Sequence, residues 1–169
     1  MVVWIIGLSG SGKSTLANAV VAKVRCVQQN IVLLDGDMIR EIFGNDLGHT
    51  LEDRHRNADR ISQLSKFLED QGVHVVCAIL SLFPDSRSWN RQHIKNYFEV
   101  FIDAPIDDLI KRDSKGIYRR FQNGEINNVA GMDIEFPKPD CPDLIIENSA
   151  SLDGLLRYAD LIAEKITNS

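Results

Sequence analysis

Short apolar runs alternate along the chain with longer segments of helical period. Five of the runs are rich in β-branched residues and continuously apolar, which is typical of strands that helices cover on both faces. The predicted strands are residues 2–6, 31–34, 73–79, 98–102 and 144–146. The predicted helices are residues 13–25, 51–71, 84–96, 106–112 and 152–166. This alternation predicts an α/β/α sandwich of three layers around a five-stranded parallel sheet.

One long segment breaks the alternation. Residues 113–142 are polar and are punctuated by glycine and proline, with a short helical pattern only near residues 118–121. A stretch of this length without regular structure is typical of a lid or a binding loop, and the alternative is a surface excursion without a role. We therefore predict one domain over residues 1–169, with a lid at about 113–142.

The amino-acid composition limits the classes of molecule that we expect the protein to bind. The 169 residues include 19 basic and 24 acidic side chains, a net charge of −5, with no block of like charge, so no footprint for nucleic acid or for an anionic membrane is present. The longest apolar run, residues 75–80, is far shorter than the ~18 residues that a membrane helix needs. The scattered Cys26, Cys77 and Cys141 fit a reducing compartment. We expect a cytoplasmic protein whose partners are small molecules or other subunits.

A glycine-rich motif follows the first predicted strand and opens the first predicted helix. The run Gly7-Leu-Ser-Gly-Ser-Gly-Lys-Ser14 matches G-x-x-x-x-G-K-[ST], whose backbone N–H groups surround phosphate oxygens at a helix N-terminus. Lys13 is expected to place its charge near the outer phosphates, Ser14 to place its hydroxyl on magnesium, and Thr15 to pack or cap the first turn. The predicted ATP-binding residues of this loop are Gly7, Ser9, Gly10, Ser11, Gly12, Lys13, Ser14 and Thr15. The motif predicts ATP and Mg²⁺ as cofactors.

Two carboxylates follow the second predicted strand. Asp35 and Asp37 fall at the carboxyl edge of the sheet, where open α/β sheets bind their ligands. Asp37 is expected to orient or deprotonate an attacking hydroxyl group, and Asp35 to hold a magnesium-bound water. The alternative for Asp37 is an N-cap of a helix over the following residues, and the two roles are compatible.

Polar residues continue the apolar stripe of the predicted helix 51–71 toward its N-terminus. Counting back from Ile61 by three and four positions reaches Asn57 and Arg54. A crossover helix runs antiparallel to its strands, so these side chains point into the mouth of the site, close to Arg40. Converging arginines suit an anionic acceptor substrate, because guanidinium groups bind phosphate-like groups through two hydrogen bonds. His49, just before this helix, is a candidate to stack on an acceptor base or to bond it, and a loop or cap role is its alternative.

The sequence motifs of the chain resemble those of the adenylylsulfate kinase family. The motifs that carry the resemblance extend over nearly the whole sequence: Gly7 to Thr15, Leu34-Asp-Gly-Asp37, Asp46-Leu-Gly48, Asp53-Arg54 with Asn57, Arg112-Asp-Ser-Lys-Gly-Ile-Tyr118, and Gly131-Met-Asp133. The resemblance implies transfer of the γ-phosphoryl group of ATP to the ribose 3′-hydroxyl of a nucleotide that carries a modified 5′-phosphate. It also implies a P-loop kinase fold, a lid over residues 113–142 and a homodimer.

The resemblance assigns roles to individual side chains as well. Arg40, Arg54 and Asn57 match the residues that hold the acceptor in the family. Lys115 matches a lid lysine near the acceptor and the phosphates, and Arg112 lies where the family contacts ATP.

Departures from the family pattern concern the acceptor. The family clamps the acceptor adenine between two phenylalanines, at positions where this chain has His49 and Val129, and its Ile-Ser-Pro reads Leu80-Ser81-Leu82 here, with Ser81 kept as an acceptor-binding residue. Losing both rings removes stacking worth ~1–3 kcal/mol per base, so we expect a different base. A smaller site with a polar ring is similar to the cytidine diphosphoramidate kinase branch, which acts in bacterial capsule biosynthesis. The alternatives are an adenylylsulfate kinase and a nucleoside monophosphate kinase, whereas a GTPase is disfavoured because the sequence lacks N-K-x-D.

Overall fold

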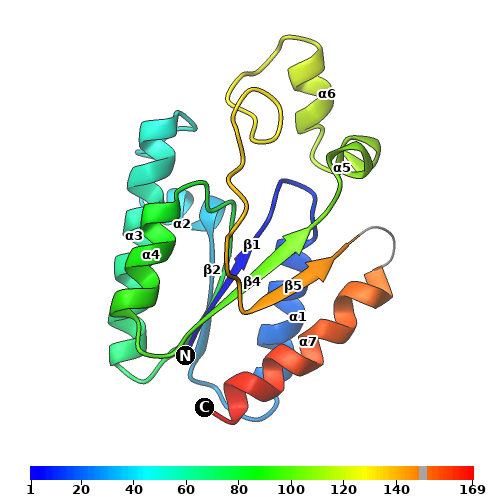
Figure 1. Ribbon diagram of the computed structural model, residues 1–169. Coiled ribbons are helices and arrows are strands. Elements are labelled where there is room, and N and C mark those ends of the chain that lie inside the picture. The colour runs from blue at the N-terminus through cyan, green and yellow to red at the C-terminus, as the bar shows by residue number, and fades with distance from the viewer. Residues whose placement is uncertain (149–151) are drawn as a thin grey trace.

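A parallel sheet with helices on both faces organises the chain (Figure 1). The computed structural model describes residues 1–148 and 152–169, in which five parallel strands are ordered β2-β3-β1-β4-β5. The strands are β1 (Val2–Ile6), β2 (Ile31–Asp35), β3 (His74–Ile79), β4 (Tyr97–Asp103) and β5 (Leu144–Glu147). The helices are α1 (Lys13–Arg25), α2 (Gly36–Ile42), α3 (Leu51–Asp70), α4 (Pro84–His93), α5 (Ile106–Arg112), α6 (Ile117–Gln122) and α7 (Leu152–Thr167). The predicted α/β class and the five strands are confirmed.

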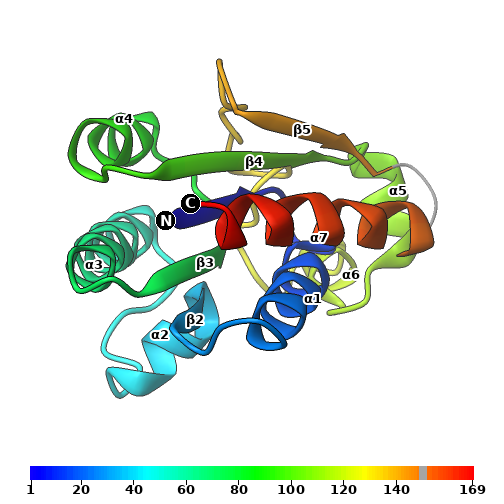
Figure 2. The ribbon, with the colours of Figure 1, turned by 90° about the horizontal axis from the view of Figure 1, so that it is seen from below.

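The sheet separates two apolar cores. Successive strand side chains point to opposite faces, so Val3 and Ile5 of β1 pack with α1 and α7, whereas Trp4 and Ile6 pack with α2 and α3. Figure 2 shows α1 and α7 on one side of the strands and α3 and α4 on the other. The whole of β1 is fully buried, which explains why its sequence is continuously apolar.

The carboxyl ends of the strands meet at one edge of the sheet. Because all strands are parallel, the turns that follow β1, β2 and β3 emerge there together, and α5 and α6 lie beyond this edge in Figure 1. This edge is the predicted location of the site. None of the described helices is long and apolar enough to span a membrane.

The sequence indicated two short helices only in part, α2 through the capping alternative at Asp37 and α6 through the pattern near residues 118–121. One predicted helix ends early. The helix α2 starts directly after β2, where the carboxylate of Asp35 accepts a hydrogen bond from the backbone N–H of Asp37 at 3.0 Å. The N-cap is therefore Asp35, and the capping role considered for Asp37 is wrong. The helix predicted over residues 84–96 ends at His93, because Ile94 is 3% exposed and turns into the core with an extended backbone.

The packing of α7 on the sheet generates a prediction about stability. Ile162 is fully buried against α1 and the sheet, whereas the neighbouring Leu161 is 49% exposed. Changing Ile162 to Ala should lower the free energy of unfolding by about 2–5 kcal/mol, because the lost methyl groups leave a cavity. Leu161→Ala is the matched control and should change it by less than about 1 kcal/mol. Denaturant unfolding measures both variants, and equal effects would contradict the packing described here.

Candidate active site

A cavity of about 600 Å³ opens at the carboxyl edge of the sheet. Its wall combines the glycine-rich loop, the start of α2, the first turns of α3, the loop after β3 and parts of residues 113–142. The lining residues that the sequence had singled out are Ser9, Gly10, Gly12, Lys13, Ser14, Thr15, Asp35, Asp37, Arg40, His49, Arg54, Asn57, Ser81, Lys115 and Val129. The structure thus brings together both carboxylates, the loop lysine and the acceptor candidates.

Three predicted site residues lie outside this lining. Gly7 lies at the foot of the loop, where an added Cβ would come within 2.9 Å of the Ile102 carbonyl oxygen. Ser11 is fully buried. Arg112 donates from Nη2 to the carbonyl oxygen of Asn148 at 3.3 Å, away from the cavity. Its contact with ATP stays a prediction.

Left-handed glycines give the phosphate loop its shape. Gly10 has φ 76° and Gly12 has φ 98°, values that L side chains rarely adopt. An added Cβ at Gly12 would also lie 2.5 Å from Cδ2 of Leu155 on α7. The loop leads directly into α1, whose N-terminus carries a partial positive charge at the cavity. Thr15 is exposed at the cavity and does not pack into the core.

Lys13 brings its ammonium group under the loop. Its Nζ donates to the carbonyl oxygen of Leu8 at 2.7 Å. Burial lowers the pKa of Lys13 to about 8, the charge of Lys115 lowers it as well, and Asp35 and Asp37 act in the opposite direction. The side chain is therefore charged at neutral pH and loses its proton under mildly alkaline conditions.

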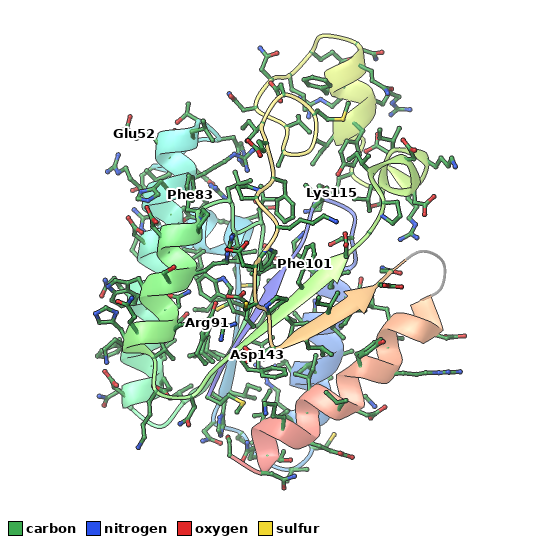
Figure 3. All side chains as sticks on the ribbon, viewed as in Figure 1. Glu52, Phe83, Arg91, Phe101, Lys115 and Asp143 are labelled. Carbon is green, nitrogen blue, oxygen red and sulfur yellow. The ribbon has the colours of Figure 1, made fainter. Side chains whose placement is uncertain are left out.

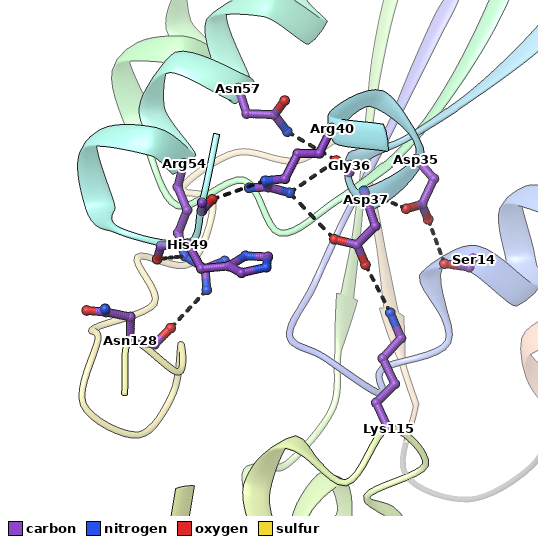
Figure 4. Close-up of polar contacts among 11 residues, drawn as sticks. Ser14, Asp35, Gly36, Asp37, Arg40, His49, Arg54, Asn57, Lys115 and Asn128 are labelled. Carbon is purple, nitrogen blue, oxygen red and sulfur yellow. Dashed lines mark hydrogen bonds and ion pairs between the residues drawn. The ribbon is translucent and has the colours of Figure 1, made fainter. Parts of the chain in front are cut away.

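The two carboxylates that follow β2 have different surroundings, as Figure 4 shows. Asp35 accepts from Ser14 Oγ at 2.9 Å through one oxygen and caps α2 through the other. Asp37 lies between two cations, with Arg40 Nη1 at 3.5 Å and Lys115 Nζ at 3.4 Å. Asp35 and Ser14 thus present hard oxygen atoms beside the phosphate loop, while the Asp37 carboxylate lies beside Arg40 and Lys115.

Arg40 is nearly buried and holds two turns of the backbone. Its Nε donates to the carbonyl oxygen of Gly48 at 3.2 Å, and its Nη1 donates to that of Gly36 at 3.1 Å. The Gly36 oxygen also accepts from Nδ2 of Asn57 at 3.2 Å. The amide nitrogen of Asn57 therefore supports the turn that carries Asp37.

Arg54 connects the start of α3 with residues far along the chain. Its Nε donates to the His49 carbonyl oxygen and its Nη2 to the Asn128 carbonyl oxygen, both at 2.9 Å (Figure 4). Burial lowers the pKa of His49, and the charges of Arg40 and Arg54 lower it further. Both effects favour the neutral imidazole, in which one nitrogen donates and one accepts, whereas Asp37 and Asp53 act in the opposite direction.

Residues 113–142 form part of the cavity wall and contact the phosphate loop. The Tyr118 hydroxyl donates to the carbonyl oxygen of Ser9 in the phosphate loop at 2.9 Å, and burial raises the pKa of Tyr118 to about 12, so the hydroxyl stays protonated. Val129 is 5% exposed and packs in the same small apolar cluster as Tyr118 and Leu109. Figure 3 shows Lys115 extending from this side toward the sheet edge.

Several lining residues escaped the sequence analysis. They are Phe83, Ser114, Ile117, Arg120, Ile126 and Asn127. Ile117 and Arg120 are three positions apart on α6 and therefore share one face of that helix. The helical pattern near residues 118–121 was the available signal, but it covers only part of α6 and leaves out Ile117.

Comparisons with known proteins agree with this geometry. The family model for adenylylsulphate kinase matches residues 1–147. A cytidine diphosphoramidate kinase from Campylobacter jejuni is 40% identical, and the match covers 98% of this chain and 95% of that protein. An adenylyl-sulfate kinase from Clostridium acetobutylicum is 42% identical over 93% of this chain and 82% of its own length.

A solved structure is similar over the full fold. The Mycobacterium tuberculosis APS kinase in complex with AMPPNP and APS has a TM-score of 0.88 and 33% identity, with 98% of this chain and 96% of that chain covered. The relatives are phosphotransferases with a hydroxyl acceptor, in agreement with a phosphate loop that faces a second, cation-rich half of one cavity. The protein is a kinase that belongs to the adenylylsulfate kinase family.

Proposed function

We propose that this kinase transfers the γ-phosphoryl group of ATP to the ribose 3′-hydroxyl of cytidine diphosphoramidate. The observation that carries the proposal is that His49 and Val129 both line the cavity. By the family resemblance, two adenine-clamping phenylalanines would stand at these positions. The 40% identity to a cytidine diphosphoramidate kinase over nearly the full length of both chains supports it. Adenylylsulfate is the second candidate acceptor, supported by the 42% identity to an adenylyl-sulfate kinase.

The charges of the cavity support two anionic ligands. Five cationic side chains line it, against the two carboxylates that follow β2; they are Lys13, Arg40, Arg54, Lys115 and Arg120. A surplus of fixed positive charge in a partly enclosed site attracts phosphorylated substrates and stabilises charge on a transferring phosphoryl group. ATP on the phosphate loop and a nucleotide acceptor on the Arg54 side would fill the two halves.

The side chains divide the reaction between them. Asp37 accepts the proton of the 3′-hydroxyl, whose oxygen forms a bond to the γ-phosphorus while the bond from that phosphorus to the β–γ bridging oxygen breaks. Lys13 and the N–H groups of the loop hold the phosphate oxygens. Ser14 and, through a water, Asp35 would hold Mg²⁺, which neutralises charge on the phosphates when it is bound. Their hydroxyl and carboxylate oxygens are the ligand type that this ion prefers.

Residues 113–142 act as the lid in this proposal, within one domain over residues 1–169. The ion pair of Lys115 with Asp37 and the hydrogen bond of Tyr118 to Ser9 support it, because they join the segment to the acceptor side and to the phosphate loop, respectively. A homodimer is the assembly that the family resemblance implies.

The choice between the two acceptors is tested by steady-state kinetics. With ATP and Mg²⁺, kcat/KM should be higher for cytidine diphosphoramidate than for adenylylsulfate. His49→Phe with Val129→Phe should shift the ratio toward adenylylsulfate by roughly tenfold or more, because two rings restore stacking worth ~1–3 kcal/mol per base. His49→Phe alone is the companion variant, since a larger side chain at the buried Val129 also strains its cluster. A wild-type preference for adenylylsulfate would contradict the cytidine assignment and favour the second candidate.

The role of Asp37 predicts a split between turnover and ATP binding. Asp37→Asn should lower kcat by about 10²–10⁴, the range of general-base contributions, because the amide cannot accept the proton. The Kd for ATP, measured by titration calorimetry, should change by less than about threefold, since the Asp37 carboxylate neither caps α2 nor bonds the phosphate loop. Similar modest effects on kcat and on Kd would remove the base assignment.

The lowered pKa of Lys13 predicts how ATP affinity depends on pH. The phosphates of ATP favour the charged form of Lys13, so ATP binding raises the pKa of this side chain. Below about pH 8, Lys13 already carries its proton before ATP binds. Above pH 8, Lys13 must take up a proton when ATP binds. The Kd for ATP should therefore rise by up to about tenfold per pH unit above pH 8, with uptake of a proton. Calorimetry in two buffers of different ionisation enthalpy measures both the Kd for ATP and the number of protons taken up. Lys13→Arg stays charged and should show no such rise; a flat profile for the wild type would contradict the assignment.

A further inference from the structure

Arg87 on α4 is a charged side chain that the proposed reaction does not use, although it is only 6% exposed. Its Nη1 donates to the carbonyl oxygen of Ser81 at 2.7 Å, and its Nη2 donates to that of Pro137 at 3.4 Å. Burying a guanidinium group costs free energy unless its N–H donors form hydrogen bonds. Here both hydrogen bonds go to backbone carbonyl oxygens of loops. One side chain therefore joins the loop after β3 to the end of residues 113–142.

The first partner, Ser81, has an unfavourable backbone conformation. Its φ is 55°, in the left-handed region that a residue other than glycine rarely adopts. Such a conformation persists only where the surroundings hold it, and it is frequent at ligand sites. Ser81 is 7% exposed, lines the cavity and accepts from Nε1 of Trp4 at 3.2 Å. Trp4 thus fixes the hydroxyl of Ser81 and Arg87 fixes its carbonyl group.

The second partner, Pro137, lies where the chain returns from the cavity toward β5. Residues 126–130 line the cavity a few positions earlier. The guanidinium group of Arg87 therefore sets the spacing between two parts of the acceptor side that are distant in sequence. These are the loop that contains Ser81 and the last part of residues 113–142. Without it the buried carbonyl oxygen of Ser81 loses a partner that an apolar side chain cannot replace.

We propose that Arg87 is a positioning residue for the acceptor: it holds Ser81 in its left-handed conformation and ties that loop to Pro137. The inference rests on the proposed function only in placing the acceptor in this cavity, and it is independent of the acceptor base. It predicts that changes at Arg87 act on acceptor binding and leave ATP binding intact, because neither carbonyl partner belongs to the phosphate loop.

The same helix offers a matched control one turn further on. Arg91 donates from Nη2 to the carbonyl oxygen of Cys141 at 2.8 Å and pairs with Asp143 at 3.1 Å and Glu99 at 3.6 Å. Figure 3 shows Arg91 beside Asp143, well below the sheet edge. Arg91 therefore anchors the same returning chain but touches no residue of the cavity.

The experiment compares Arg87→Lys with Arg91→Lys. Lysine keeps the charge and the apolar stem but has one nitrogen in place of Nη1 and Nη2, so it loses the fixed spacing of the two donors. Arg87→Lys should raise the acceptor KM by about tenfold while the Kd for ATP stays within about twofold, as expected for the loss of one hydrogen bond from a charged group. Arg91→Lys should leave both constants within about twofold. An unchanged acceptor KM in Arg87→Lys, or equal KM effects in the two variants, would overturn the positioning role.

Hydrogen exchange supplies a readout that needs no acceptor. Arg87→Lys should accelerate amide exchange in residues 80–83 and at the amides of Phe136 and Lys138 together, and Arg91→Lys only at those of Cys141 and Asp143. Unaltered exchange at residues 80–83 in Arg87→Lys would overturn the inference even if the wild type phosphorylated neither candidate acceptor. That last result would instead contradict the proposed function, so the two failures are distinguishable.

Discussion

The half of the cavity proposed to hold the acceptor depends on hydrogen bonds from arginine side chains to backbone carbonyl oxygens. The strands end at the sheet edge, and the loops beyond it have carbonyl groups that no neighbouring strand pairs. Arg54 bonds the carbonyl groups of His49 and Asn128, and Arg40 bonds those of Gly36 and Gly48. The fixed fork of a guanidinium group suits this task, because two donors at a set angle define the separation of two loops. Charged side chains therefore connect the loops around this half of the cavity, beside the small apolar cluster that contains Val129 and Tyr118.

This construction explains why the site is rich in positive charge before any substrate is present. The carboxylates of Asp35 and Asp37 offset only part of it, and the lowered pKa of Lys13 shows that burial and a neighbouring ammonium group already oppose its charge. Two phosphorylated ligands would relieve that repulsion. The Lys115 to Asp37 ion pair joins residues 113–142 to the sheet edge through the carboxylate that is proposed as the base. In the proposed mechanism the same charges would bind the substrates and connect this segment to the sheet edge.

The sequence predicts the parts of the molecule that local pattern controls. The strands are recognisable because both of their faces are buried, and Arg54 and Asn57 are recognisable because helical spacing extends the buried stripe of α3 to the cavity. The helices α2 and α6 were indicated only in part, by the possible cap at Asp37 and by the short pattern near residues 118–121, because polar and charged residues interrupt the apolar ones in both. Arg87 escapes for another reason: its partner Pro137 lies 50 positions away, and α4 carries charged residues on its exposed face as well. Only the folded chain shows which arginine is buried.

In the proposed reaction, the two halves of the cavity bring ATP and a ribose hydroxyl together for direct phosphoryl transfer. The most direct measurement is to incubate the protein with ATP, Mg²⁺ and cytidine diphosphoramidate, and then to locate the transferred phosphoryl group by phosphorus–proton correlation NMR. The account predicts a new phosphomonoester coupled to the 3′ proton of the acceptor ribose, formed with one ADP per product. A phosphoryl group elsewhere on the acceptor, or ATP hydrolysis at the same rate with and without acceptor, would contradict it.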